Sequence, residues 1–349
     1  MIKNCTIISL IIFLSCSLYE DTEQPDIYFQ INDFDMLPMG RTISDMMMGP
    51  NNNFLYLCDY NNNSMIKISA QGTMKIIDEL VVGSHPIAMD ISPDKSHIAV
   101  AMEGESNVYL ISLEDFTIST IISVSLMNMN DIVFVNSNRL LLSSTTDPTV
   151  ITYDIDSDTE SSQSILNGEL LIDQEDSIAY VASSSSIKKY HISNNQASLS
   201  PYVADPFGFS ATINHFIINH DILYVCLNNK EDSESIRSIY SYNANTLTFA
   251  GKYQVGSPGL GVVVDTNNEK IFIAPQDADE NGIFIIEFDA QTKLEKNYYL
   301  AAGNLKEKCM VIDQTSSYIY ILVNTPGDND SFEPYNDYPF DLQRIEIYN

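Results

Sequence analysis

The chain has 349 residues, 44% of them hydrophobic, which is enough to bury a sizeable core. Acidic residues outnumber basic ones 47 to 17, so the formal net charge is -30. A surface this negative repels nucleic acid and anionic lipid headgroups, which argues against both as partners and favours cations or basic partners. A solvated acidic coat with no partner is the plainer interpretation.

The first sixteen residues have the pattern of an export signal. Lys3 is followed by an apolar stretch over 7–14 and then by Ser15 and Cys16. The stretch is too short to cross a bilayer as a stable helix. Phe13-Leu14-Ser15-Cys16 resembles a bacterial lipobox, although that motif usually has Leu where Phe13 stands. The resemblance implies acylation of Cys16; the alternative is an ordinary secretory peptide with an incidental cysteine.

Residues 17–25 are polar and acidic, with no apolar periodicity, and are typical of a flexible tether. An acidic stretch soon after the cysteine also resembles the surface-export signal of some bacterial lipoproteins. We therefore expect a lipid-anchored protein of the cell envelope, held by its acyl group in a lipid bilayer. The outer membrane or cell surface is the expected location, rather than the cytoplasmic membrane.

Three further cysteines, Cys58, Cys226 and Cys309, lie far apart among apolar neighbours. Their number is odd, and no CxxC or zinc-type spacing is present. We therefore predict small buried thiols rather than a disulfide framework.

One short apolar run recurs seven times, separated by turns rich in Asn, Asp, Ser and Gly. Its members recur every 38 to 48 residues, a period typical of propeller blades with four strands each. The sequence therefore predicts an all-β fold over 26–349: one seven-bladed β-propeller with four-stranded antiparallel blades, expected to be a monomer. The equivalent positions are Leu55, Ile98, Leu140, Ile178, Leu223, Ile271 and Ile319.

The last blade ends at Asn349 after three strands, and a spare run, DIYFQIN, begins at Asp26. A strand from one terminus that completes the blade at the other terminus removes an exposed edge and closes the ring. We therefore predict that the run from Asp26 is the fourth strand of the seventh blade. The lipid tether would then leave the ring at the rim of that blade.

Residues 83–119 contain a VG-P turn, an SPDK turn after the first strand and a valine-containing third strand. This pattern resembles the YVTN family of propeller repeats, related to lactonase and quinoprotein-type propellers. Lys95 stands where that family has glycine. The chain has no tryptophan, which excludes intact WD-type repeats and tryptophan-docked blades. The resemblance speaks to the fold, and function has to be argued from a site.

The longest loop of the predicted ring covers 324–341 and combines acids with Phe332, Tyr335 and Tyr338. Aromatic side chains beside acids suit carbohydrate or peptide recognition. An unstructured acidic insertion in the last blade is the alternative.

Asp277, Asp279 and Asn281 are followed by Gly282, which matches the start of a calcium-binding loop. The twelfth position is Phe288, where an EF-hand needs a bidentate glutamate. Ca²⁺ is therefore a possible ligand, and chance spacing in a chain rich in Asp is the alternative.

Basic residues are scarce, and four of them, Arg41, His85, Lys306 and Lys308, fall in predicted inter-blade loops of neighbouring blades. Together they would form an anion pocket in a negative protein. Local pairing with Asp and Glu is the alternative.

No HExxH, GxSxG or glycine-rich phosphate loop occurs, and no catalytic residue is predicted. The first hypothesis is a membrane-displayed binding or scaffold propeller with a protein, peptide or glycan ligand. The second is a lactonase-like hydrolase with its site at the mouth of the central channel. A funnel with converging Glu, His and Arg would favour the enzyme, and an acidic, aromatic face would favour binding.

Overall fold

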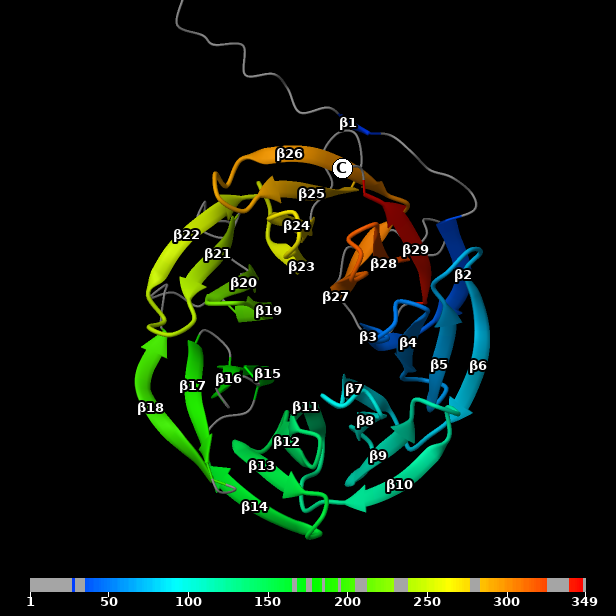
Figure 1. Cartoon of the computed structure of the whole chain (residues 1–349), viewed down its shortest axis with the longest axis vertical. Helices are drawn as coiled ribbons and strands as arrows, with labels where there is room; N and C mark the ends of the chain where they lie inside the picture. Colours follow the sequence, from blue (N-terminus) through cyan, green and yellow to red (C-terminus); the bar gives the residue numbers. More distant parts are fainter. Residues whose placement is uncertain are drawn as a thin grey trace, which may run out of the picture.

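The computed structural model describes residues 27–28, 35–164, 168–173, 178–183, 186–193, 196–204, 212–228, 238–276, 283–324 and 339–347. They form seven antiparallel sheets of four strands each, and one of the sheets carries an additional short strand. Figure 1 shows the sheets arranged as blades around a central channel, with the chain passing from blade to blade in sequence order. The predicted seven-bladed propeller is confirmed.

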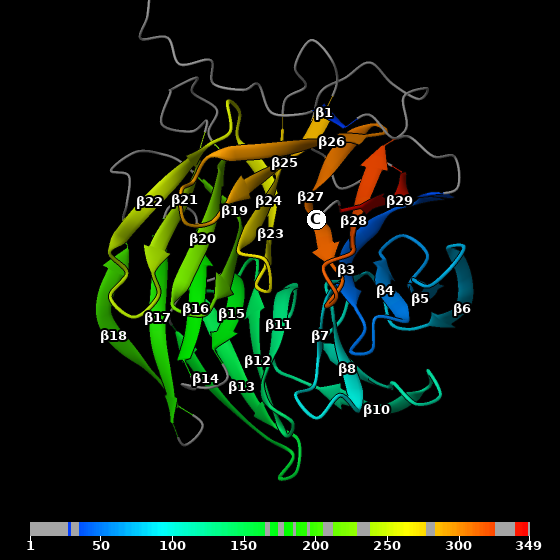
Figure 2. The same cartoon turned by 45° about the horizontal axis from the view of Figure 1, so that its top comes forward.

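Within each blade, strand order follows the chain outward from the channel. The innermost strands line the channel and run roughly along its axis (Figure 2). These innermost strands, from blade 1 to blade 7, are β3 (Ile43–Met48), β7 (Pro86–Ile91), β11 (Met129–Asn136), β15 (Glu169–Asp173), β19 (Thr212–Asn219), β23 (Gly259–Asp265) and β27 (Asn304–Ile312). The second strands are β4 (Phe54–Asp59), β8 (His97–Met102), β12 (Arg139–Ser144), β16 (Ile178–Ser183), β20 (Ile222–Asn228), β24 (Lys270–Pro275) and β28 (Tyr318–Asn324).

The remaining strands complete the blades toward the outside. The third strands are β5 (Ser64–Ser69), β9 (Asn107–Ser112), β13 (Thr149–Asp154), β17 (Ser186–Ser193), β21 (Ser238–Asn243), β25 (Ile283–Asp289) and β29 (Phe340–Glu346). The outer strands are β6 (Lys75–Val81), β10 (Ile118–Ser123), β14 (Thr159–Ser164), β18 (Gln196–Ala204), β22 (Phe249–Gln254), β26 (Glu295–Ala301) and, for blade 7, β2 (Met36–Arg41). All seven repeat positions expected from the sequence lie on second strands.

The hydrophobic core lies between neighbouring blades. Second strands are almost fully buried, as in β4, because both of their faces pack against adjacent blades. Outer strands such as β6 are mostly exposed. The buried clusters bridge successive blades, one joining blades 1 to 3 and another joining blades 6, 7 and 1, so the core follows the ring. Cys58 and Cys226 are buried reduced thiols in this core, as predicted, and the side chain of Cys309 lies outside the described set.

The ring is closed by an N-terminal strand in blade 7, but not by the run from Asp26. Strand β2, ten residues further along, pairs with β29 through Met36↔Gln343 and Leu37↔Leu342. At every other junction an outer strand leads directly into the next innermost strand, and β2 ends two residues before β3 begins.

The sequence of β2, MLPMGR, hid its role because Pro38 has no N–H and Gly40 weakens a strand. Both residues are tolerated on an outer edge. Here the carboxylate of Asp341 accepts the N–H groups of Met39, at 2.7 Å, and Gly40, at 3.0 Å, where the ladder with β29 is irregular.

The run from Asp26 instead contributes β1 (Ile27–Tyr28), which pairs in parallel with β26 as a fifth strand on blade 6. The chain before the propeller therefore reaches the outer edge of blade 6, and the predicted departure from blade 7 is wrong. Among the described residues, no helix is long and apolar enough to cross a membrane.

Lys95 has a φ of 62°, in the left-handed region that glycine adopts without strain. Its N–H donates to the carbonyl of Ser92 at 2.8 Å and closes the turn between β7 and β8. The glycine preference noted at this position thus has a backbone cause.

Candidate functional site

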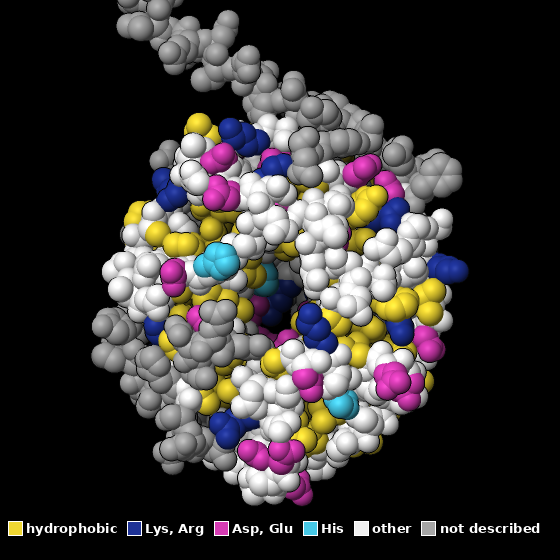
Figure 3. All heavy atoms as spheres, viewed as in Figure 1, with side chains coloured by type: hydrophobic (Ala, Val, Ile, Leu, Met, Phe, Trp, Pro, Cys, Tyr) yellow, Lys and Arg dark blue, Asp and Glu magenta, His cyan; other side chains and the backbone are white. Residues whose placement is uncertain are grey.

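The central channel carries a belt of charged side chains supplied by the innermost strands. Asp45, Asp131 and His215 each follow a shift in the ladder between the first and second strands of their blade. Such irregularities redirect a side chain, and here they occur near the start of the strand, at one mouth of the channel. Figure 3 shows acidic, basic and histidine side chains inside the hollow at the centre of the ring.

Three aspartates of this belt join neighbouring blades. One carboxylate oxygen of each accepts the N–H of the following residue, and the other accepts an N–H from the innermost strand of the next blade. They therefore connect blades 1 to 4 within the channel. The inter-blade bonds run from Met89 N to Asp45 (2.8 Å), from Phe134 N to Asp90 (2.6 Å) and from Leu170 N to Asp131 (2.7 Å).

Burial raises the pKa of both Asp90 and Asp131 to about 7. Their backbone hydrogen bonds oppose this shift without cancelling it. Lys308 opposes it further at Asp131, whereas the charge of Glu169 adds to it. These carboxylates therefore exchange protons near neutral pH.

An ion pair crosses the channel from blade 7 to blade 4. The Lys308 ammonium lies 3.1 Å from a carboxylate oxygen of Glu169, and the same oxygen lies 3.1 Å from Nδ1 of His215 on blade 5. The Lys308 side chain keeps 34% of its surface exposed, so the channel is accessible to water here. Lys308 also has a φ of 53°, and strain of this kind at a non-glycine residue concentrates at functional sites.

Glu169 and Asp131 lie on neighbouring strands, yet their pKa values move in opposite directions. Burial raises the pKa of Glu169, but the adjacent Lys308 and His215 outweigh it and hold that pKa below its usual value. Burial lowers the pKa of Lys308, but Glu169, Asp131 and Asp45 outweigh it and raise that pKa. Lys308 and Glu169 therefore remain charged at neutral pH.

Glu307 is the acid of the channel mouth without a direct partner. It lies between Lys306 and Lys308 in β27, and its carboxylate has no hydrogen bond within the described part of the chain. Burial raises its pKa, and the two lysines oppose the shift. Its electrostatic neighbours also include Glu169 and His215, which places it in the same belt.

Of the four basic residues predicted to form an anion pocket, Arg41 and His85 each have surroundings of their own. Arg41 pairs with Asp59 at 2.8 Å and with Glu79 at 3.2 Å. His85 stacks on Tyr60, with ring centroids 4.5 Å apart.

Lys306 and Lys308, in contrast, belong to the channel, where Lys306 donates to the carbonyl of Ser44 at 3.3 Å. Arg41 and Lys308 thus follow the local-pairing alternative, and an anion pocket from all four residues stays a prediction.

The remaining predicted site residues, Phe332, Tyr335 and Tyr338 of the long loop and Asp277, Asp279 and Asn281 of the calcium-like loop, lie outside the described residues. Within the described ranges, no group of three or more His, Cys, Asp or Glu side chains could hold a metal ion.

Sequence reasoning missed Glu169, His215 and Glu307. A signal was present, because an acid or histidine stands near the start of innermost strands that are otherwise apolar, as in SDMMM, NDIVFV, GELLI and NHFII. A polar residue in a strand that lines a channel faces the axis of the ring, and several of them must meet there.

No protein-family model matches the sequence, and no curated protein matches it. The resemblance to YVTN repeats therefore stays a prediction.

Solved structures do match. U3-55K superposes with a TM-score of 0.64 at 9% identity, over 88% of this chain and 97% of that one. The C-terminal WD40 domain of Sif2 superposes with a TM-score of 0.60 at 12% identity, over 88% of this chain and 82% of that domain. At these identities the likeness establishes the propeller fold alone. This ring shares it without any tryptophan.

Proposed function

We propose that this chain is a binding propeller of the cell envelope, anchored by lipid at Cys16, that takes a basic peptide segment at the mouth of its central channel. The observation that carries the proposal is Glu307, a partly buried carboxylate with no hydrogen bond within the described part of the chain. A lysine or arginine side chain of a ligand would supply its missing partner.

The charge of the surroundings supports a basic ligand. Within the belt, the acids outnumber the basic residues: Asp45, Asp90, Asp131, Glu169 and Glu307 against Lys306, Lys308 and His215. A formal net charge of -30 attracts cationic segments from a distance and speeds their encounter with the ring.

The binding test uses an array of basic, neutral and acidic peptides probed with the full-length chain and with Glu307→Gln. We expect binding to basic peptides that weakens steeply with added salt and falls at least tenfold in the variant. Glu346→Gln, an exposed acid of β29, is the matched control and should bind as the parent does. The proposal would be rejected if binding did not depend on basic residues in the peptide and was unchanged in Glu307→Gln.

The anchor is tested separately by labelling cells with a palmitate analogue. The parent chain and Cys5→Ala should take up the label, and Cys16→Ala should not. A Cys16→Ala chain that keeps its label would remove lipid anchoring from the proposal and leave the channel untouched.

A hydrolase acting on an ester or lactone is the second candidate, because Glu169 and His215 form a carboxylate–imidazole pair in the channel. Nδ1–H of His215 would donate to Glu169, leaving Nε2 to accept a proton from water, with Lys308 beside it as a cation. A hydrolase site was expected to bring together Glu, His and Arg, and the channel has Lys308 in place of the arginine. Turnover of model lactones by the parent, lost in His215→Gln, would support this candidate, and no turnover by the parent would reject it.

A further inference from the structure

Four blades have a tyrosine at the third position of the second strand: Tyr56, Tyr180, Tyr224 and Tyr320. In blade 7 the Tyr320 hydroxyl donates to the carbonyl of Ala70 in blade 1, at 3.0 Å. In blade 4 the Tyr180 hydroxyl donates to the carbonyl of Ala244 in blade 5, at 3.1 Å. Each acceptor is the first residue after the third strand of the next blade, so the bond is a repeated junction between blades.

Blade 5 makes the same junction through a second tyrosine. The Tyr224 ring lies beside that of Tyr253, with centroids 6.1 Å apart, and the Tyr253 hydroxyl donates to the carbonyl of Ala290 in blade 6, at 3.2 Å. Ala290 is again the first residue after a third strand.

The junction between blades 1 and 2 departs from this rule. The equivalent acceptor would be the carbonyl of Leu113, the first residue after β9. Tyr56 does not reach it: its hydroxyl has no hydrogen bond within the described ranges, although the side chain is only 2% exposed. The Tyr56 hydroxyl is not among the described side-chain atoms that are fully buried without a partner, so it is accessible from the adjoining cavity and can bond to a ligand there.

The lysine opposite Tyr56 does not donate to this junction either. In blade 7, the third-strand cation opposite Tyr320 is Arg344, which donates a further hydrogen bond to the carbonyl of Ala70, at 3.1 Å. The equivalent residue of blade 1, Lys67, lies instead over the rings of Phe54, at 4.3 Å, and Phe116, at 5.4 Å.

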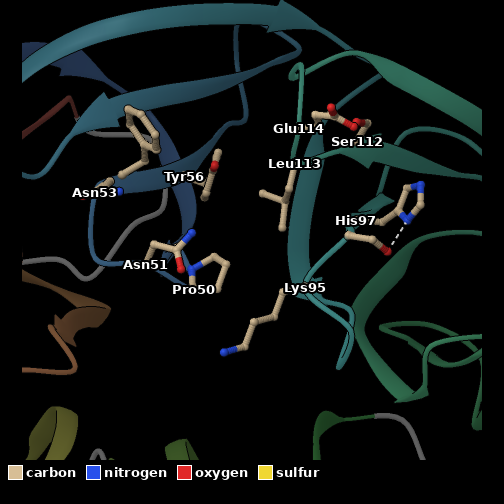
Figure 4. A pocket seen from close by; sticks show the side chains of 12 residues that line it. Pro50, Asn51, Asn53, Tyr56, Lys95, His97, Ser112, Leu113 and Glu114 are labelled. Carbon is tan, nitrogen blue, oxygen red and sulfur yellow. Dashed lines mark hydrogen bonds between the residues drawn. The ribbon is translucent and has the colours of Figure 1, made fainter.

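A cavity of about 500 Å³ occupies the place of the missing bond. This volume is within the range of roughly 300–1,000 Å³ typical of small-molecule sites. Figure 4 shows Tyr56 between Pro50 and Asn51 on one side and Leu113 on the other, with His97 and Lys95 across the opening. β3 runs from Asp45 in the channel belt to the turn at Pro50, so this cavity and the channel mouth lie at opposite ends of the strand.

The lining offers both donors and acceptors, most of them neutral. The side-chain amides of Asn51 and Asn53 have no hydrogen bond within the described chain. The Ser96 hydroxyl donates to Asp94 and lies 2.7 Å from Nδ1 of His97. In the tautomer in which Nδ1–H of His97 donates to Ser96, Nε2 of His97 is an acceptor.

We infer that the cavity between blades 1 and 2 is a binding site for a neutral sugar residue of a glycan. Sugar hydroxyls both donate and accept, which matches a phenol, two amides and an imidazole acceptor, and the C–H faces of a sugar fit the apolar surfaces of Pro50 and Leu113. A phosphate or sulfate is disfavoured, because the positive charge of Lys95 is offset by the negative charge of Glu114 in the lining of the same cavity. The protein as a whole is also strongly negative.

The site is independent of the channel and is tested with an array of neutral and acidic oligosaccharides, probed with the full-length chain. We expect at least one neutral oligosaccharide to bind. Tyr56→Phe should weaken it about five- to tenfold, the loss of one hydrogen bond, and Asn53→Ala should act similarly. Tyr320→Phe, the same change at the equivalent position of blade 7, is the matched control and should bind as the parent does.

Tyr56→Phe removes a hydroxyl that bonds to no described residue, so it should keep the fold and a loss of binding would report on the ligand. The inference is overturned if no neutral sugar binds, or if binding survives both Tyr56→Phe and Asn53→Ala. The inference would also be overturned if only acidic sugars bound, through Lys95.

Discussion

The junction between blades 7 and 1 and the junction between blades 1 and 2 each have a tyrosine opposite a cation, but these side chains make different contacts at the two junctions. Tyr320 and Tyr56 occupy the same strand position, opposite Arg344 and Lys67 respectively. The first pair bonds to the next blade, whereas the second pair leaves a cavity of about 500 Å³. A repeat thus sets which groups are available at a junction, and the neighbouring blade decides whether they are used for structure or remain open to a ligand.

The largest expected effect comes from the two cations. Arg344→Met removes hydrogen bonds to the carbonyls of Ala70 and Gly72 and an ion pair with Asp35, from a side chain only 12% exposed. We expect a loss of about 3 kcal/mol in the free energy of unfolding. Lys67→Met removes a cation–π contact and should cost about 0.5–1 kcal/mol.

Urea unfolding of both variants measures these losses. Equal losses in the two variants would show that Arg344 and Lys67 stabilise their junctions to the same extent.

A second prediction contrasts the tyrosine junctions with those closed by channel carboxylates. Asp90 and Asp131 have folded pKa values of about 7, above the ordinary value of 3.8, so the folded state holds more protons between about pH 4 and 7. Their contribution to stability is therefore present at acidic pH and is lost as the pH rises through about 7.

We expect the free energy of unfolding to fall between pH 5 and pH 8, by roughly 2–3 kcal/mol for each group and mostly below pH 7. Asp131→Asn should flatten this dependence, whereas Tyr320→Phe should leave its slope unchanged. The measurement is a series of urea transitions across that range. A stability that rises with pH would contradict the assignment.

The third prediction compares the two tyrosines directly. Tyr320→Phe leaves the buried Ala70 carbonyl with one donor fewer and should cost about 1–1.5 kcal/mol. Tyr56→Phe should change the free energy of unfolding by less than about 0.5 kcal/mol, because its hydroxyl bonds to no described residue. Matched thermal and urea transitions test the pair, and a large cost at Tyr56 would reveal a structural partner for its hydroxyl.

The smallest expected effect is at the rim of the cavity. Lys95→Gly relieves a left-handed backbone at φ 62° and should stabilise the protein by about 0.5 kcal/mol, after the greater freedom of glycine in the unfolded chain is deducted. A small rise in the urea midpoint is the expected outcome. A fall would show that the Lys95 side chain stabilises the turn more than its backbone strains it.

The candidate site was predicted only in part. Lys306 and Lys308 stood out because basic residues are scarce, and both lie in the channel. Glu169, the partner of Lys308, comes from blade 4, and His215, which contacts the same Glu169 oxygen, comes from blade 5. Both lie far from Lys308 along the chain, and neither has a local motif. Ion pairs across a channel depend on which strand registers face one another, and register is not written in any single repeat.

By itself, the sequence determined the number of blades, the order of strands within them and the turn at Lys95, because alternation, turn chemistry and repeat length are local properties. The tertiary structure alone decided which N-terminal strand completes blade 7, since Pro38 and Gly40 in β2 conceal a strand that only the geometry of the junction with β3 requires. It also decided that Tyr56, unlike Tyr320, bonds to no described residue of the ring, because the position of the next blade sets whether a hydroxyl and a carbonyl meet.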